Sequence, residues 1–338
     1  MSRVVRIQTD FASGEIDPLL RSRIDLKQYY QALQTAQNVF ILPQGGAKRR
    51  DGLKFVAEIP SSAAPQNGVR AIPFEFNTSD SYMFVVAHQR IYIFKNKALV
   101  TNINGSGNNF LAVTAITSAM LSTLRHAQSA DTMILVQEDL TPLKIVRGAN
   151  DATWTVSAIT FENTPQHAFT ISTSNPSATI TPDVASDNIT LTASAGVFAS
   201  GNVGQYINIL NNFGRLRIIE FVSSTKVRAY AEVALFDATV IASGDWELET
   251  GYEDAWSASK GYPKSLTFHE GRLYFGGTKS LPTTFYGSVV NSFFDFDLGE
   301  GFDDRAIIAT ITTESLNAIV DIFSGRDLQI FTTGGEFY

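Results

Sequence analysis

Cysteine is absent from this chain of 338 residues, so disulfides and thiolate metal sites are excluded. Long apolar runs are absent as well, and no stretch approaches the roughly 20 residues that a membrane-spanning helix needs. The first residues, MSRVVRIQTD, lack the apolar core of a signal peptide. We therefore expect a soluble protein without a membrane anchor, made in a reducing compartment.

Charged residues are scarce, at 17% of the chain, while hydrophobic residues make up 44%. This composition is typical of a folded chain with an uncharged polar surface. The net charge of −7 is uneven, because residues 1–60 hold nine Lys/Arg and six Asp/Glu. The remainder therefore carries −10, which argues against tight non-specific binding of nucleic acid. The same charge is compatible with a channel through which a polyanion passes without binding tightly.

Catalytic motifs are also lacking, since HExxH, GxSxG and P-loop patterns do not occur. The four histidines, His88, His126, His167 and His269, are scattered along the chain. His88 and His269 lie at matching turns of two predicted hairpins, which indicates repeat architecture. We expect no catalytic residue, no metal and no cofactor.

The chain has one carboxylate cluster, formed by Asp295, Asp297, Glu300, Asp303 and Asp304. Carboxylate oxygens so close in sequence are suitable ligands for Ca²⁺. A pair such as Asp295 and Asp297 is also compatible with glycoside hydrolysis. We favour a third interpretation, a solvated loop between two blades with no fixed geometry.

Hairpins recur along most of the chain, because alternating apolar and polar runs bounded by Gly and Pro are typical of antiparallel strands. They are predicted at residues 85–94, 266–275 and 322–331, with a weaker copy joining 133–136 to 143–146. Each strong copy has an arginine just after the turn: Arg90, Arg272 and Arg326. Arg272 and Arg326 are about 50 residues apart, a spacing typical of β-propeller blades.

Residues 168–250 interrupt this repeat and are rich in Thr, Ser, Ala and Asn. Four strands are predicted there, at 189–193, 205–209, 216–221 and 226–233, as in a small β-sandwich or barrel. The blades then occupy 68–167 and 251–338. We expect the last blade to be incomplete at Tyr338, so that the chain continues or something else completes it. A four-bladed ring or an open sandwich also fits.

Residues 1–60 differ from the rest. Asp25 is predicted to cap a helix over 26–37, strands are predicted at 39–42 and 54–57, and 61–67 is a plausible linker. The segment is too small to hold a core of its own, so we expect it to pack on the propeller, on another subunit, or on both. Its basic run, Lys48-Arg49-Arg50, is compatible with contact to DNA, with contact to an acidic protein partner, or with a solvated turn that contacts nothing. We favour a protein interface.

Several motifs, in order, resemble the tail nozzle proteins of short-tailed phages, the tail tubular protein B class. The N-terminal motifs are Phe11-x-x-Gly14-Glu15-x-x-Pro18, Arg23-x-Asp25-Leu26, Tyr30, Asn38, Gly45-Gly46 and Arg49-Arg50-x-Gly52. Later ones are residues 72–76, 127–131, Trp154, 159–161, 261–263, 272–275, Ser288, 293–296, 328–332 and Gly335-Glu336. The resemblance therefore spans the chain except 168–250. It departs at Asp51, where the family more often has Pro, and in length, since relatives are longer.

The resemblance implies a structural virion protein and not an enzyme. It further implies that six copies form a homohexameric ring below the portal adaptor. Residues 1–60 would form a platform, and double-stranded DNA would pass through the ring without sequence-specific binding. Expected partners are other copies of the chain, the adaptor or head-to-tail connector protein, and tail fibres or other tail proteins. The expected location is the virion tail, after synthesis in the host cytoplasm. The residues expected at the assembly interface are Phe11, Gly14, Glu15, Pro18, Arg23, Asp25, Lys48, Arg49 and Arg50.

Two other functions remain open. Aromatic-rich turns are compatible with a carbohydrate- or receptor-binding propeller of the tail. The carboxylates of residues 295–304 are compatible with a glycan-degrading enzyme.

Overall fold

The structure is a computed structural model that describes residues 7–60, 68–211, 213–298, 302–312 and 317–338. The predicted linker, residues 61–67, lies outside these ranges. The described chain is mainly β, and it divides into two compact units, Met1–Val56 and Ala57–Tyr338. Within the same ranges, no helix has the length and apolar character needed to cross a membrane.

The first unit contains two minimal sheets. In one, β1 (Gly14–Glu15) pairs in parallel with β2 (Ala32–Leu33). In the other, β3 (Val39–Ile41) pairs antiparallel with β4 (Ala47–Arg49). Short 3-10 helices, η1 (Pro18–Leu20) and η2 (Lys27–Gln31), connect the first pair.

The α-helix predicted over residues 26–37 is wrong, because only the five residues of η2 are helical and Ala32 is already extended. Asp25 caps nothing and instead hydrogen-bonds Arg23. Most helical stability comes from packing an apolar face, and Tyr30 of the expected apolar stripe is 56% exposed. The strand predicted at 54–57 is also wrong, since these residues pair with no strand.

In the second unit, four small sheets are arranged like the blades of a four-bladed β-propeller. Neighbouring strands follow chain order and pair antiparallel, as the repeated hairpins predict. The first sheet comprises β5 (Arg70–Glu75), β6 (Ser81–Ala87), β7 (Arg90–Lys95), β8 (Ala98–Leu99) and β9 (Leu111–Ala112), with β9 also on β7. The second comprises β10 (Arg125–Ser129), β11 (Thr132–Gln137), β12 (Leu140–Arg147) and β13 (Trp154–Ala158). Helices η3 (Ile103–Gly105) and η4 (Ser118–Met120) lie between these two sheets in the chain.

The third and fourth sheets follow the same plan. The third comprises β21 (Ser265–His269), β22 (Arg272–Gly276), β23 (Thr284–Gly287) and β24 (Ile307–Thr310). The fourth has three strands, β25 (Ile319–Ser324), β26 (Leu328–Thr332) and β27 (Glu336–Phe337). All four predicted hairpins are therefore confirmed, and the four sheets have a propeller-like arrangement. The hairpins at 85–94 and 133–146 are the second and third strands of their sheets, whereas those at 266–275 and 322–331 are the first and second, so the predicted common register is wrong.

Apolar clusters join consecutive sheets. Between the first two, the Trp154 ring lies 5.2 Å from the Phe74 ring and 5.1 Å from the Phe84 ring. Between the second and third, Ile134 and Val136 share a cluster with Leu273 and Phe275. Ile322 and Ile330 of the fourth sheet pack with Phe285 of the third. Burial of these side chains on both faces stabilises the stack of sheets.

A polar cluster at the contact of the first two sheets predicts acid sensitivity. The Lys95 ammonium lies 2.5 Å from an Asp80 oxygen and 2.8 Å from an Asp151 oxygen. Hydrogen bonding to Lys95 lowers the pKa of both carboxyls, and Tyr82 lowers the pKa of Asp151 further. A folded pKa below the unfolded value of about 3.9 adds stability above that pH, and this stability is lost as the pH falls through the folded pKa.

We therefore expect urea unfolding to show a loss of stability below about pH 4 that is steeper in the natural protein than in Asp80→Asn/Asp151→Asn. If the free energy of unfolding falls equally steeply with pH in the two proteins, Asp80 and Asp151 are not the source of the acid sensitivity. Measurements at about pH 7, where the carboxyls of the natural protein are ionised, give the reference free energy of unfolding for each of the two proteins.

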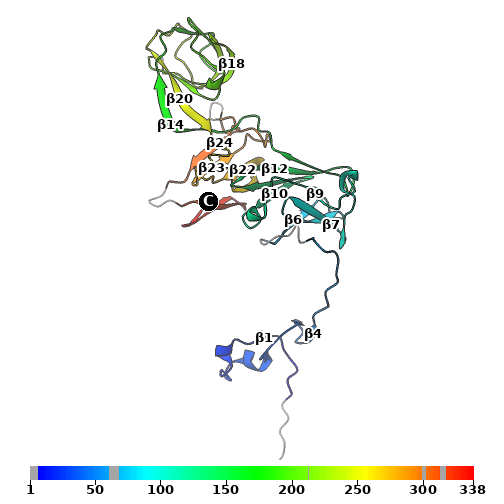
Figure 1. The fold of residues 1–338 in the computed structure, drawn as a ribbon. Coiled ribbons are helices and arrows are strands. Elements are labelled where there is room, and N and C mark those ends of the chain that lie inside the picture. Colours follow the sequence, from blue (N-terminus) through cyan, green and yellow to red (C-terminus); the bar gives the residue numbers. More distant parts are fainter. Residues whose placement is uncertain (1–6, 61–67, 212, 299–301, 313–316) are drawn as a thin grey trace, which may run out of the picture. The chain divides into compact units, whose positions relative to one another are not determined.

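The remaining strands form one seven-stranded antiparallel sheet, in which the predicted strands at 189–193, 205–209, 216–221 and 226–233 are present. Its spatial order is β14 (Gln166–Ser174), β20 (Trp246–Asp254), β17 (Tyr206–Ile209), β18 (Arg215–Ser223), β19 (Lys226–Val233), β16 (Asn188–Ala193) and β15 (Ile180–Pro182), with η5 (Ser200–Asn202) before β17. The sheet has its own apolar cluster, in which buried Trp246 donates a hydrogen bond of 2.8 Å to the Ala178 carbonyl. Strands β14 and β20 lie side by side (Figure 1). Gly251 has a φ of +92° there, and a Cβ would overlap the Thr170 carbonyl oxygen.

Candidate functional site

Backbone hydrogen bonds hold the first part of the predicted assembly interface together. The Phe11 amide donates to the Gly45 carbonyl at 2.7 Å, so residue 11 lies against the turn between β3 and β4. Gly14 has a φ of +67° and donates its amide to the Phe11 carbonyl. The Glu15 carboxylate accepts a bond of 2.9 Å from the Ala36 amide. These contacts order a segment that has little regular structure.

The charged members of this predicted interface are exposed. Arg23 donates two hydrogen bonds, of 2.8 and 2.7 Å, to the Asp25 carboxylate, which lowers the pKa of Asp25. Lys48 lies 3.8 Å from Asp51. Within the described part of the chain, no ion pair joins Lys48, Arg49 or Arg50 to Glu15 or Asp25. The basic run on and after β4 is exposed, and Pro18 begins η1 at an exposed position.

The apolar surface of the first unit is its most unusual property. Among its described residues, only Gly45 is buried. The exposed large apolar side chains are Ile7, Leu19, Leu20, Ile24, Tyr30, Phe40, Leu42, Leu53, Phe55 and Val56. Large exposed apolar patches mark interaction sites. The size of the segment predicted that it lacks a core, but which side chains remain uncovered was not predicted.

The carboxylate cluster is better ordered than predicted. Asp295 accepts hydrogen bonds of 2.9 Å from the Asn163 amide group and 3.0 Å from the Asp297 backbone amide. Asp297 pairs with Arg217 of the seven-stranded sheet and lies 3.8 Å from Arg305. The solvated-loop interpretation is therefore wrong for Asp295 and Asp297, because both are half-buried and bonded.

The rest of the cluster gives no sign of a metal site. Asp303 and Asp304 are exposed, and Glu300 lies outside the described residues. In the described ranges, no group of three or more His, Asp or Glu side chains is placed to hold a metal ion. His88 accepts a bond of 3.1 Å from the Ser118 amide, and His269 lies 3.0 Å from the Ser324 hydroxyl, so both have hydrogen-bond partners within the fold.

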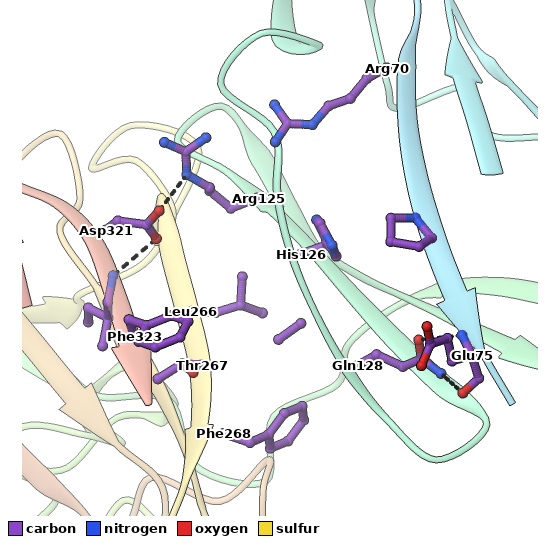
Figure 2. A pocket seen from close by; sticks show the side chains of 13 residues that line it. Arg70, Glu75, Arg125, His126, Gln128, Leu266, Thr267, Phe268, Asp321 and Phe323 are labelled. Atoms are coloured by element: carbon purple, nitrogen blue, oxygen red, sulfur yellow. Dashed lines mark hydrogen bonds and ion pairs between the residues drawn. The ribbon is translucent and has the colours of Figure 1, made fainter. Parts of the chain in front are cut away.

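A groove of about 580 Å³ opens between the first strands of all four propeller-like sheets, and we call it the axial groove. It is lined by side chains of β5, β10, β21 and β25 (Figure 2). On β5, Pro73 and Glu75 alternate with the buried core residues Ile72 and Phe74. The period of two along each strand therefore places one set of residues in the core and the other in the groove.

Polar contacts join different sheets along the axial groove. The Arg125 Nε atom of β10 lies 3.2 Å from an Asp321 oxygen of β25. The Gln128 side chain donates a bond of 2.7 Å to the Glu75 carbonyl of β5. His126 is half-buried, and its pKa is lowered by burial and then by the charges of Arg70 and Arg125.

Sequence reasoning missed the axial groove. Two of the strands that line it, β5 and β10, precede the hairpins predicted for the first two sheets, so the charged residues that they carry were not placed on any predicted strand. The chain matches no protein-family model and no curated protein.

Proposed function

We propose that the protein is a structural subunit of a phage tail, a nozzle ring below the portal adaptor whose channel conducts DNA during ejection. The observation that carries this proposal is the uncovered apolar surface of residues 7–56. A segment of this size that buries no apolar side chain gains little stability from its own packing. Such a segment becomes stable when it is covered by another molecule, as in a permanent assembly.

The finer organisation belongs to the same proposal. Residues 1–60 form the platform that contacts the adaptor or a neighbouring copy, with the exposed basic run Lys48–Arg50 at its edge. Residues 168–250 form an inserted domain with an outward role, docking tail fibres or decorating the shaft. In support, the seven-stranded sheet has a hydrophobic cluster of its own and is entered and left through the paired strands β14 and β20.

Charge supports a conduit and not a DNA-binding protein. The chain carries a net charge of −7, and residues 1–60 hold an excess of Lys and Arg. Tight binding of DNA needs phosphates to be neutralised by Lys and Arg. An acidic wall repels phosphate weakly, so DNA passes without being retained.

Electron microscopy of negatively stained protein tests the proposal. The intact chain is expected to form rings, and a chain that starts at Ala57 is expected to form single particles. Rings made by the shortened chain would show that residues 1–56 are dispensable for assembly and would overturn their role.

A further inference from the structure

One end of the axial groove is rich in positive charge. Arg70 of β5 extends toward Arg125 of β10 at that end, and the Arg125 side chain turns toward Asp321 (Figure 2). The pKa of Arg70 is lowered by burial and by the charge of Arg125. Two guanidinium groups placed together in this way repel each other unless an anion lies between or beside them.

Both arginines have more N–H donors than they use in hydrogen bonds within the described part of the chain. One terminal nitrogen of Arg70 donates to the carbonyls of Leu121 and Ser122, at 3.2 and 3.1 Å. In the part of the chain that the structure describes, Arg125 has no charged partner other than Asp321. Its buried Nε makes no hydrogen bond of good geometry there. Since each guanidinium has five N–H donors, several remain for a ligand.

The charges that line the groove do not cancel at this end. Strand β25 contributes Asp321, which neutralises one of the two arginines. The other carboxylate, Glu75, lies at the far end of β5 from Arg70 (Figure 2). Strand β21 contributes only Leu266, Thr267 and Phe268. Arg70, Arg125 and Asp321 together therefore carry one net positive charge.

We propose that the axial groove binds a sugar-sized organic anion whose carboxylate or phosphate group is held by Arg70 and Arg125. Planar guanidinium groups bind both kinds of oxyanion through paired charge-assisted hydrogen bonds. The volume of about 580 Å³ lies in the range of small-molecule sites. The body of the ligand lies against the rings of Phe268 and Phe323, with the hydroxyl of Thr267 beside them.

Calorimetric titration of the intact protein with glucuronate, glucose 6-phosphate and glucose tests the proposal. At least one of the two anions is expected to bind, and glucose is expected to bind more weakly by a factor of about ten or more. The stronger of the two anions identifies the oxyanion as carboxylate or phosphate. If neither anion binds, or if glucose binds equally well, the proposal is wrong.

Three variants assign the binding to the groove. Arg125→Gln is expected to weaken anion binding by about tenfold, whereas the exposed Arg326→Gln of the fourth sheet leaves it unchanged. Asp321→Asn is expected to strengthen binding, because it removes the carboxylate that competes for Arg125. A variant with a damaged fold cannot bind more tightly, so tighter binding in Asp321→Asn supports the proposal. Unchanged or weaker binding in Asp321→Asn, with urea unfolding like that of the natural protein, contradicts it. Equal losses in Arg125→Gln and Arg326→Gln also contradict it.

Discussion

Replacement of Arg272 by methionine is expected to lower the free energy of unfolding by about 3 kcal/mol or more. Arg272 is buried, at 6% exposed, and begins strand β22. Its guanidinium donates to the Ser288 carbonyl at 2.5 Å and also to the carbonyls of Asp303 and Arg305. Methionine fills much of the volume but removes all three hydrogen bonds, each to a charged donor and worth about 1.5–3 kcal/mol when buried, and it leaves the buried Ser288 carbonyl without this donor.

The repeat supplies matched controls for Arg272. Arg90 holds the equivalent hairpin position and lies 4.5 Å above the Phe110 ring, so Arg90→Met is expected to cost only about 0.5–1 kcal/mol. Arg326 is exposed, and Arg326→Met is expected to change stability by less than about 0.5 kcal/mol. Urea unfolding of the three variants measures this order. Three equal losses would contradict the role assigned to the Arg272 hydrogen bonds.

The double variant Leu53→Glu/Phe55→Glu is expected to weaken assembly of the intact chain by about a hundredfold or more. Leu53 and Phe55 are 90% and 79% exposed, so glutamate at these positions disturbs no packing within the chain. In an assembly, each buried side chain of this size contributes about 1.5–3 kcal/mol, and the two together account for the expected factor. Sedimentation velocity over a range of protein concentrations measures the effect.

Phe302→Glu is the control for this pair. Phe302 is 62% exposed but belongs to the second unit, so the same kind of change is made outside residues 1–56. The control is expected to assemble like the natural protein. If it loses assembly as completely as the double variant, then residues 53 and 55 have no special part in the interface.

Local hairpins were predictable because each is encoded by a few consecutive residues. Strands β21 and β22 follow from alternating apolar residues around a tight turn, where Glu270 and Gly271 have φ values of +44° and +74°. The same pattern predicted β6 and β7, where Gln89 has a φ of +58°. Their pairing needs no information from distant parts of the chain.

The helix predicted over residues 26–37 did not form, and its apolar stripe is only partly covered in its own unit, with Tyr30 exposed and the other members half-buried. A stripe at helical spacing predicts a helix only when something buries it. Tyr30 instead lies within the short 3-10 helix η2, and Leu26 comes just before it. The first unit buries too little apolar surface to stabilise a long helix, and the same shortage leaves large apolar side chains exposed.

The axial groove could not be predicted because it joins residues from four separate sheets. Arg125 and Asp321 form an ion pair between the second sheet and the fourth. The sequence shows which residues alternate on each strand, but not which distant strands bring their charges together. Asp297 illustrates the same limit, since its partner Arg217 lies in the seven-stranded sheet.

The mass of the intact protein in solution tests the assembly proposal most directly. Sedimentation equilibrium on the full chain is expected to give a multiple of 36.9 kDa that corresponds to a homohexamer, and Leu53→Glu/Phe55→Glu is expected to give smaller species. A single species of 36.9 kDa at every concentration, for the intact chain and the variant alike, would contradict the account.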